Sequence, residues 1–418
     1  MSTACATEGG SSDEQGDSTG AADDDDTGAD DDVNPEDTGP DDTGTDPDDT
    51  GNDPDGTGGD CPVDVDFPDV DETPCGPLAT GFVPDTEDDY PACVADSGEW
   101  TLIADAPGAA ARAEAYEGIE ALLRNGAMPD ADAFTEARAL YATENGLESR
   151  VARRDDVHYP PIPEAEQDPK VEFDQQCTIL ENVANYPDRC VGPAKMQPLI
   201  DDAFAAGMTG DGDPAVHAAR IDAVLQWFLF VSSYKESASC VPLPQDCDSH
   251  WAYYGGATMR AEPIGFGANI KAISEVAHNA IYDGILAVLC WRDLNPGDGD
   301  PTWEELDMAG QDMFLAAHEQ LDNALWYGWA RLVRSYLEQQ PAVCGSEADA
   351  NWAFLQIAGP VLEPEAARRD AAAAADLTGV WGGDALAPEE LQAAVAAIDA
   401  IFPCPQCESC EVLPSWGY

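Results

Sequence analysis

Residues 268–291 constrain the fold most, because apolar side chains recur there at intervals of three and four. These side chains are Ile270, Ile273, Ala277, Ile281, Ile285 and Val288. Such spacing places them on one stripe of an α-helix that faces a core. Glu275, His278 and Tyr282 lie on the flank of the stripe, so we expect them to be partly buried and to need hydrogen-bond partners. The sequence therefore predicts one long, largely buried helix.

A helical period begins near Pro107 and continues almost to the end of the chain. The segments that show it best are 109–125, 130–143, 171–185, 193–207, 214–231, 301–339, 348–362, 365–375 and 388–402. At Asp213 and Asp300 an N-capping residue precedes proline, a pattern that starts helices. No stretch alternates for long as a strand would. We therefore predict an all-α fold, a multi-helix bundle of eight to ten helices, either single or divided into two sub-bundles.

Composition divides the chain into three regions. Residues 1–60 are rich in Asp, Gly and Thr and lack core-forming side chains, so we expect a disordered acidic stalk. Residues 61–106 are rich in Cys and Pro and should form a collar, and residues 107–418 form the helical domain with a Cys-rich tail. The whole chain has 83 Asp and Glu against 18 Lys and Arg, a formal net charge of -65. This charge excludes nucleic acid as a partner.

The first residues indicate export and a lipid anchor. Ser2-Thr3-Ala4-Cys5 resembles the lipobox of bacterial lipoproteins, although Ser2 replaces the usual large apolar residue. Met1 would then lie inside a longer precursor, or the signal peptide has been trimmed; the alternative is a free Cys5 in a disordered tail. No apolar run reaches the roughly 20 residues of a membrane span. We expect an outer-membrane or cell-surface lipoprotein of the cell envelope, or an extracellular protein, that meets a membrane only through its lipid.

Cysteine usage also favours an oxidising compartment. Without Cys5, twelve cysteines remain, an even number that is typical of disulfide-bonded exported proteins. Short separations predict two pairs, Cys177 with Cys190 and Cys240 with Cys247. The tail cysteines at 404, 407 and 410 are expected to form disulfides, with Cys290 and Cys344 as possible partners.

Two pairs of side chains could form a metal site. Glu275 and His278 have the E-x-x-H spacing by which a helix presents a carboxylate and an imidazole to a transition metal. His318 and Asp322 lie one turn apart on another predicted helix. If the two helices are antiparallel neighbours, the four side chains converge on one ion. Otherwise each His is a core residue with a local partner.

Calcium is a further candidate cofactor, at residues 293–304. This stretch has acidic or amide groups at the first, third and twelfth places of a calcium-binding loop. Gly297 and Asp298 depart from the pattern at the fifth ligand and at the turn glycine. An EF-hand is therefore excluded, and only another mode of calcium binding stays open.

Aromatic side chains mark a second kind of candidate site. Trp251 and Tyr254 lie in a stretch rich in aromatic residues, and aromatic side chains with polar tips either line binding clefts or pack loops. With Tyr282 and Trp326 they are the predicted ligand-binding residues. The sequence contains no C-x-x-C-H, H-E-x-x-H, G-x-S-x-G or Walker A motif, so no catalytic residue is predicted.

Taken together, an exported, all-helical chain rich in Trp and Tyr resembles the imelysin-like proteins, helical-bundle envelope lipoproteins tied to metal handling. The resemblance is architectural and covers about residues 107–402; the family's H-x-x-E motif follows none of the five His. The leading interpretation is a non-enzymatic lipoprotein whose helical domain binds an unknown ligand or protein partner. The alternatives are a metal-binding bundle, with or without catalytic activity, and a purely structural or interaction module.

Overall fold

The chain folds into α-helices, as predicted. The computed structural model describes residues 62–72, 75, 106–124, 126–144, 146–241, 243–294, 303 and 306–404. These residues form about ten α-helices of seven residues or more and no strand. The longer helices are α1 (Pro107–Leu123), α2 (Ala131–Tyr141), α5 (Gln197–Thr209), α6 (Pro214–Ala238), α7 (Pro244–Gly255), α8 (Phe266–Ile273), α9 (Glu275–Leu294), α10 (Met308–Gln339), α11 (Ser346–Arg369) and α13 (Pro388–Ile401). Short helices are α3 (Leu147–Val151), α4 (Leu180–Asn185) and α12 (Ala371–Ala374).

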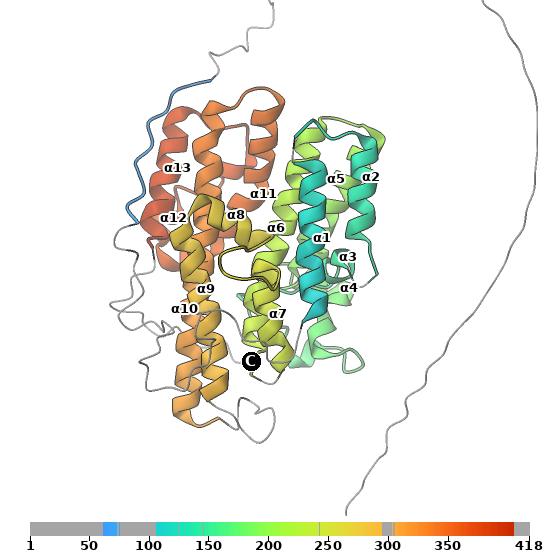
Figure 1. The fold of residues 1–418 in the computed structure, drawn as a ribbon, viewed down its shortest axis with the longest axis vertical. Coiled ribbons are helices and arrows are strands. Elements are labelled where there is room, and N and C mark those ends of the chain that lie inside the picture. Colours follow the sequence, from blue (N-terminus) through green and yellow to red (C-terminus); the bar gives the residue numbers. More distant parts are fainter. Residues whose placement is uncertain are drawn as a thin grey trace, which may run out of the picture. The chain divides into compact units, whose positions relative to one another are not determined.

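Helix α6 is the centre of the core. It begins at Pro214, where the Asp213 side chain caps the first turn by accepting a hydrogen bond from Ala215 N. Side chains from Ile221 to Ser233 are buried around the whole helix, as expected of a helix that is apolar on all sides. Helix α6 packs against α5 and α7 as well as against α10 and α11 (Figure 1). It therefore joins the earlier helices of the domain to the later ones.

The predicted long helix at 268–291 is two helices. Helix α8 ends at Ile273 and α9 begins at Glu275, because Ser274 between them has an extended backbone with φ of -150° and ψ of 108°. The Ser274 hydroxyl accepts a hydrogen bond from Ala277 N at 2.9 Å, which is the contact of an N-cap. It also donates to Glu72 Oε1 at 2.5 Å. The periodic stripe hid this break, since the apolar side chains keep their spacing across it.

Helices α9 and α10 are antiparallel and approach each other closely. Gly284 lies where an added Cβ would stand 2.7 Å from Leu321 Cα, and Gly328 lies against Ile281. From Ile281 to Gly284 along α9, the contacted residue on α10 changes from Gly328 back to Leu321, so the two helices are antiparallel. Helix α10 begins at Met308, later than the predicted start at Pro301, because the Asp307 side chain caps Gly310 N at 2.8 Å. The predicted calcium loop lies mostly outside the described residues.

An extended segment, residues 62–72, crosses the later helices; we call it the strap (Figure 1, blue). Arg334 of α10 donates to Pro68 O at 2.5 Å, and Gln392 of α13 donates to Asp66 O at 2.7 Å. At its end, Glu72 accepts from Ser274 and from the Tyr327 hydroxyl. The strap is the described part of the predicted collar; residues 76–105 lie outside the description.

Three disulfides join described residues. Cys177–Cys190 and Cys240–Cys247 confirm the two predicted local pairs. Cys404 pairs with Cys75, at a sequence separation of 329, and not with Cys290 or Cys344 as the sequence suggested. Cys344 is also disulfide-bonded. Such bonds are typical of an oxidising, extracytoplasmic compartment.

The predicted stalk and Cys5 lie outside the described residues, so disorder and lipidation stay predictions. Within the described helices, none has the length and apolar character needed to cross a membrane.

Candidate functional site

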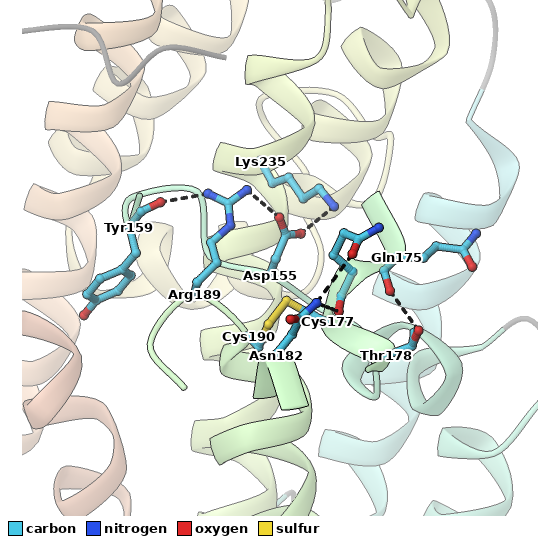
Figure 2. The surroundings of a disulfide bond; sticks show 10 residues. Asp155, Tyr159, Gln175, Cys177, Thr178, Asn182, Arg189, Cys190 and Lys235 are labelled. Carbon is cyan, nitrogen blue, oxygen red and sulfur yellow. Dashed lines mark hydrogen bonds and ion pairs between the residues drawn. A yellow bond between two sulfur atoms is a disulfide. The ribbon is translucent and has the colours of Figure 1, made fainter. Parts of the chain in front are cut away.

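The site is built on residues 155–159, a segment fixed from both sides (Figure 2). Arg189, which directly precedes Cys190 within the Cys177–Cys190 loop, donates to Tyr159 O at 2.8 Å and to Asp155 Oδ2 at 2.7 Å. Lys235 of α6 forms an ion pair with Asp155 Oδ1 at 2.6 Å. The disulfide and α6 thereby hold the segment in place. His158 within this segment contacts Asp322 of α10.

His158 lies between two carboxylates. Its Nδ1 is 2.6 Å from Asp156 Oδ1, and its Nε2 is 3.1 Å from Asp322 Oδ1 on α10. The ring stacks on Tyr234 with centroids 3.8 Å apart. Burial alone would lower the pKa of His158, but the two carboxylates outweigh burial and raise this pKa to about 10. His158 is therefore an imidazolium at neutral pH, with both N–H groups engaged.

His318 has the opposite protonation state. It is 6% exposed and lies between Tyr234, at 4.6 Å between centroids, and Phe314, at 5.5 Å. Burial lowers the pKa of His318 to about 4, although Asp322 and a hydrogen bond to the Tyr234 backbone act against this. The ring is therefore neutral at physiological pH, and its Nε2 has no hydrogen-bond partner. His158 and His318 both lie against the Tyr234 ring. They differ in charge because only His158 contacts a carboxylate with each of its two ring nitrogens.

These residues form one end of a cavity of about 1530 Å³ that runs along α6. Helices α5, α10 and α11 supply its other walls, and residues 156–159 close the end near His158. Aromatic rings contributed by Tyr159, Trp227, Tyr234 and Trp326 line it, together with aliphatic side chains such as Leu199 and Ile357. It is larger than the roughly 300–1,000 Å³ usual for a small-molecule site, and its walls combine apolar side chains with many charged ones.

Four side chains that line this cavity have a ring nitrogen without a hydrogen-bond partner. His217 Nδ1, Trp227 Nε1, His318 Nε2 and Trp326 Nε1 are buried and have no hydrogen-bond partner. All four side chains line the cavity, and each is at most 9% exposed. A buried polar atom left unsatisfied costs about 1–3 kcal/mol, so folded proteins rarely keep several together. They are spread along the cavity, from His217 near one end to His318 near the other, and polar groups of a ligand or ordered water at these points would complete the hydrogen bonding.

The residues predicted to form a metal site are not brought together. Because Gly284 lies against Leu321 on antiparallel helices, a rise of 1.5 Å per residue separates His278 from His318 by roughly 13 Å along the axis. His278 instead contacts the Tyr254 hydroxyl at 2.9 Å and Arg260 O at 2.9 Å. Within the described residues there is no group of three or more His, Cys, Asp or Glu side chains arranged to hold a metal ion.

The predicted ligand-binding aromatics also lie in different places. Trp326 lines the large cavity, whereas Trp251 lines a smaller hollow beside Met259 and Pro263. Tyr254 donates to or accepts from His278, and Tyr282 packs beneath Arg260 with the guanidinium carbon 4.5 Å from its ring centroid. Sequence reasoning missed His158, Trp227 and Tyr234, the residues that shape the cavity with Trp326.

No protein family, curated protein or solved structure matches this chain. The fold and the site therefore define only a class: an all-helical, disulfide-bonded protein with an aromatic, polar cavity beside its central helix. The resemblance to imelysin-like proteins stays a prediction from architecture.

Proposed function

We propose that this chain is an exported, non-enzymatic binding protein that takes a small organic ligand into the cavity beside α6. One observation carries the proposal: four side chains that line the same cavity each have a buried ring nitrogen without a partner. Ligand groups that hydrogen-bond to these nitrogens would remove the desolvation cost of about 1–3 kcal/mol for each. The lipid anchor at Cys5 and the acidic stalk would hold this domain out from the cell surface, which agrees with its disulfides.

The chemistry of the cavity favours binding over catalysis. The described residues that line it include no Ser, Thr or Cys, so it offers none of the usual hydroxyl or thiol nucleophiles. A general base needs a pKa near the working pH and a free proton site. His158 has neither, because Asp156 and Asp322 occupy both of its nitrogens. His318, with its lowered pKa, is suited to accept a hydrogen bond rather than to shuttle a proton.

The experiment compares cavity-filling and control variants against a diverse fragment library by ligand-observed NMR. Ala206 is half-buried on α5 and lines the cavity, and its neighbour Ala205 is exposed and does not. We expect fragments to bind the wild type and Ala205→Trp, and those that bind beside residue 206 to be lost in Ala206→Trp, because the indole occupies that part of the cavity. Ala194→Phe, from another wall of the cavity, serves as a second filling variant if Ala206→Trp folds poorly.

Circular dichroism and the melting temperature establish that each variant is folded. Fragment binding that is equal in Ala205→Trp, Ala206→Trp and Ala194→Phe would show that the cavity is not the ligand site and would overturn the proposal.

A further inference from the structure

We propose that the ligand of this cavity is a linear organic polyamine, a chain of methylene groups with several positively charged amines. This inference rests on the proposed function and names its ligand class. It is carried by the length of the cavity, by the carboxylates along it, and by the way in which the protein already holds a cation there.

The cavity is long enough for an extended chain. Its residues on α6 extend from His217 to Tyr234, and those on α11 from Ala353 to Arg368. At 1.5 Å per residue these spans are about 25 Å and about 22 Å. A methylene chain lying along Leu199, Ile357 and Val361 would bury apolar surface over most of that length. A compact ligand would leave much of the cavity unfilled.

Carboxylates outnumber basic groups along the walls. Seven carboxylates line the cavity, against Lys195, Arg220, Arg368 and the His158 imidazolium. Glu365 pairs with Arg368, and Asp188 pairs with Lys195. Among the ion pairs between described residues, none within 4 Å involves Asp202, Glu319 or Glu363, which come from three different helices. The cavity therefore carries an excess of negative charge, which suits a cationic ligand.

Glu319 marks the position where a positive charge would gain most. Burial and the Asp322 carboxylate one turn away on α10 raise the pKa of Glu319 above its usual value. A ligand ammonium beside Glu319 would relieve the repulsion between the two carboxylates. Arg220 lies toward the opposite end, one turn from His217, and Arg368, which lowers the pKa of Glu319 in part, is paired with Glu365, so we place the amines at the end formed by His158 and His318.

The protein's own cation shows how an amine is held at this end. The His158 imidazolium stacks on Tyr234, lies 4.9 Å from the Trp326 ring and contacts two carboxylates. Aromatic faces attract cations electrostatically, and they do so more strongly where water is excluded. His318 adds an acceptor, since its neutral ring has a lone pair on Nε2 with no donor to meet it. An ammonium N–H is such a donor, whereas the indole N–H groups of Trp227 and Trp326 are donors themselves and gain no partner from an amine.

The experiment measures binding of two trivalent cations to the full chain by calorimetry at fixed salt. Spermidine is linear and hexaamminecobalt(III) is compact, so the pair separates shape from charge. Octanedioate, a linear dianion, tests whether the cavity prefers a positively or a negatively charged ligand. We expect one spermidine per chain bound at least tenfold more tightly than either other probe. The overall charge of -65 attracts any cation, so the matched trivalent pair is essential.

Variants locate the binding. We expect Ala194→Phe to abolish the spermidine site, because residue 194 lines the cavity and follows Gly192, whose N donates to Arg154 O beside residues 155–159, and we expect Ala205→Trp to keep it. Glu319→Gln should weaken spermidine binding about tenfold, the effect of losing a charge-assisted hydrogen bond. Asp312→Asn, an exposed acid on the same helix outside the cavity, should change it less than about twofold.

Equal affinities for spermidine and hexaamminecobalt(III), or tighter binding of octanedioate, would overturn the polyamine inference. Spermidine binding that Ala194→Phe leaves intact would do the same. If fragments still bind in the cavity in these cases, the proposed function survives and only the ligand class is wrong. If neither fragments nor spermidine bind there, both proposals fail.

Discussion

His158 is a positive charge enclosed by protein, and its stability contribution should depend on pH. Its pKa of about 10 in the folded state exceeds the ordinary value of 6.5, so the folded state binds the proton more tightly. The stabilisation is then fully present below pH 6.5 and is lost as the pH rises from 6.5 through 10. We expect a loss of roughly 3 kcal/mol in the free energy of unfolding across this window.

Two measurements check this expectation. Urea unfolding between pH 6 and pH 10 gives the loss, and NMR of the imidazole nitrogens gives the His158 titration directly. Asp322→Asn removes one of the two carboxylates, so the titration should move to lower pH, and the loss should be smaller and should end at a lower pH. An imidazole that titrates near 6.5 in the wild type would contradict the prediction.

The contacts of His158 could not be predicted from the sequence. His158 lies in a proline-rich loop without helical period, and Asp322 is 164 residues away. No pattern along the chain links them, because the contact depends on how α10 packs against residues 155–159. His318 and Asp322 were recognised as one pair from their spacing, but the structure joins Asp322 to a histidine from another region.

At the scale of elements, the break at Ser274 should have a measurable cost. Ser274→Ala removes the N-cap of α9 and the hydrogen bond to Glu72 together. We expect the free energy of unfolding to fall by about 1–2 kcal/mol, as measured by urea denaturation. Ser249→Ala on α7 is the control, because its exposed hydroxyl bonds only the preceding turn. Losses of equal size in both variants would argue against a capping role.

The close approach of α9 and α10 leads to a second prediction for elements. In Gly284→Ala the new methyl group would lie 2.7 Å from Leu321 Cα, so the two helices must separate. We expect a loss of about 1–3 kcal/mol, measured by chemical denaturation. Gly382→Ala adds the same methyl group where no atom lies within 4 Å and should be nearly neutral. A Gly284→Ala protein as stable as the control would mean that the helices pack less tightly.

Helix content was predictable from the sequence, whereas helix ends were less so. Apolar spacing identified the helices, since burial requires one face of each. The Asp213–Pro214 start was also found, because its cap lies within one turn. The helix break at Ser274 was not predicted, because the apolar stripe continues across it. Helix α10 begins later than predicted, because its N-cap is Asp307 and not Asp300.

For the whole molecule, the Cys75–Cys404 bond should stabilise the fold more than a local disulfide does. The chain-entropy account predicts about 5–6 kcal/mol for its 329-residue separation and about 2–3 kcal/mol for Cys240–Cys247, separated by 7. We expect Cys75→Ser/Cys404→Ser to lower the melting temperature more than Cys240→Ser/Cys247→Ser. Calorimetry under oxidising conditions makes the comparison, and the reverse order would contradict it.

The same contrast in separation explains which disulfides could be predicted. Cysteines seven or thirteen residues apart are neighbours in almost any fold, so both local pairs were found. Cys75 and Cys404 meet only because the strap crosses α10 and α13, an arrangement that no local pattern contains. The tail cysteines were expected to pair, but their partner was not among those considered.

The Cys75–Cys404 bond also determines what proteolysis can release. A protease that cuts the chain once anywhere between residues 76 and 403 leaves both fragments covalently joined through this disulfide. Cleavage there would therefore not shed the helical domain from whatever holds its amino-terminal end. Shedding would need a cut before Cys75, or reduction of this bond as well as a cut.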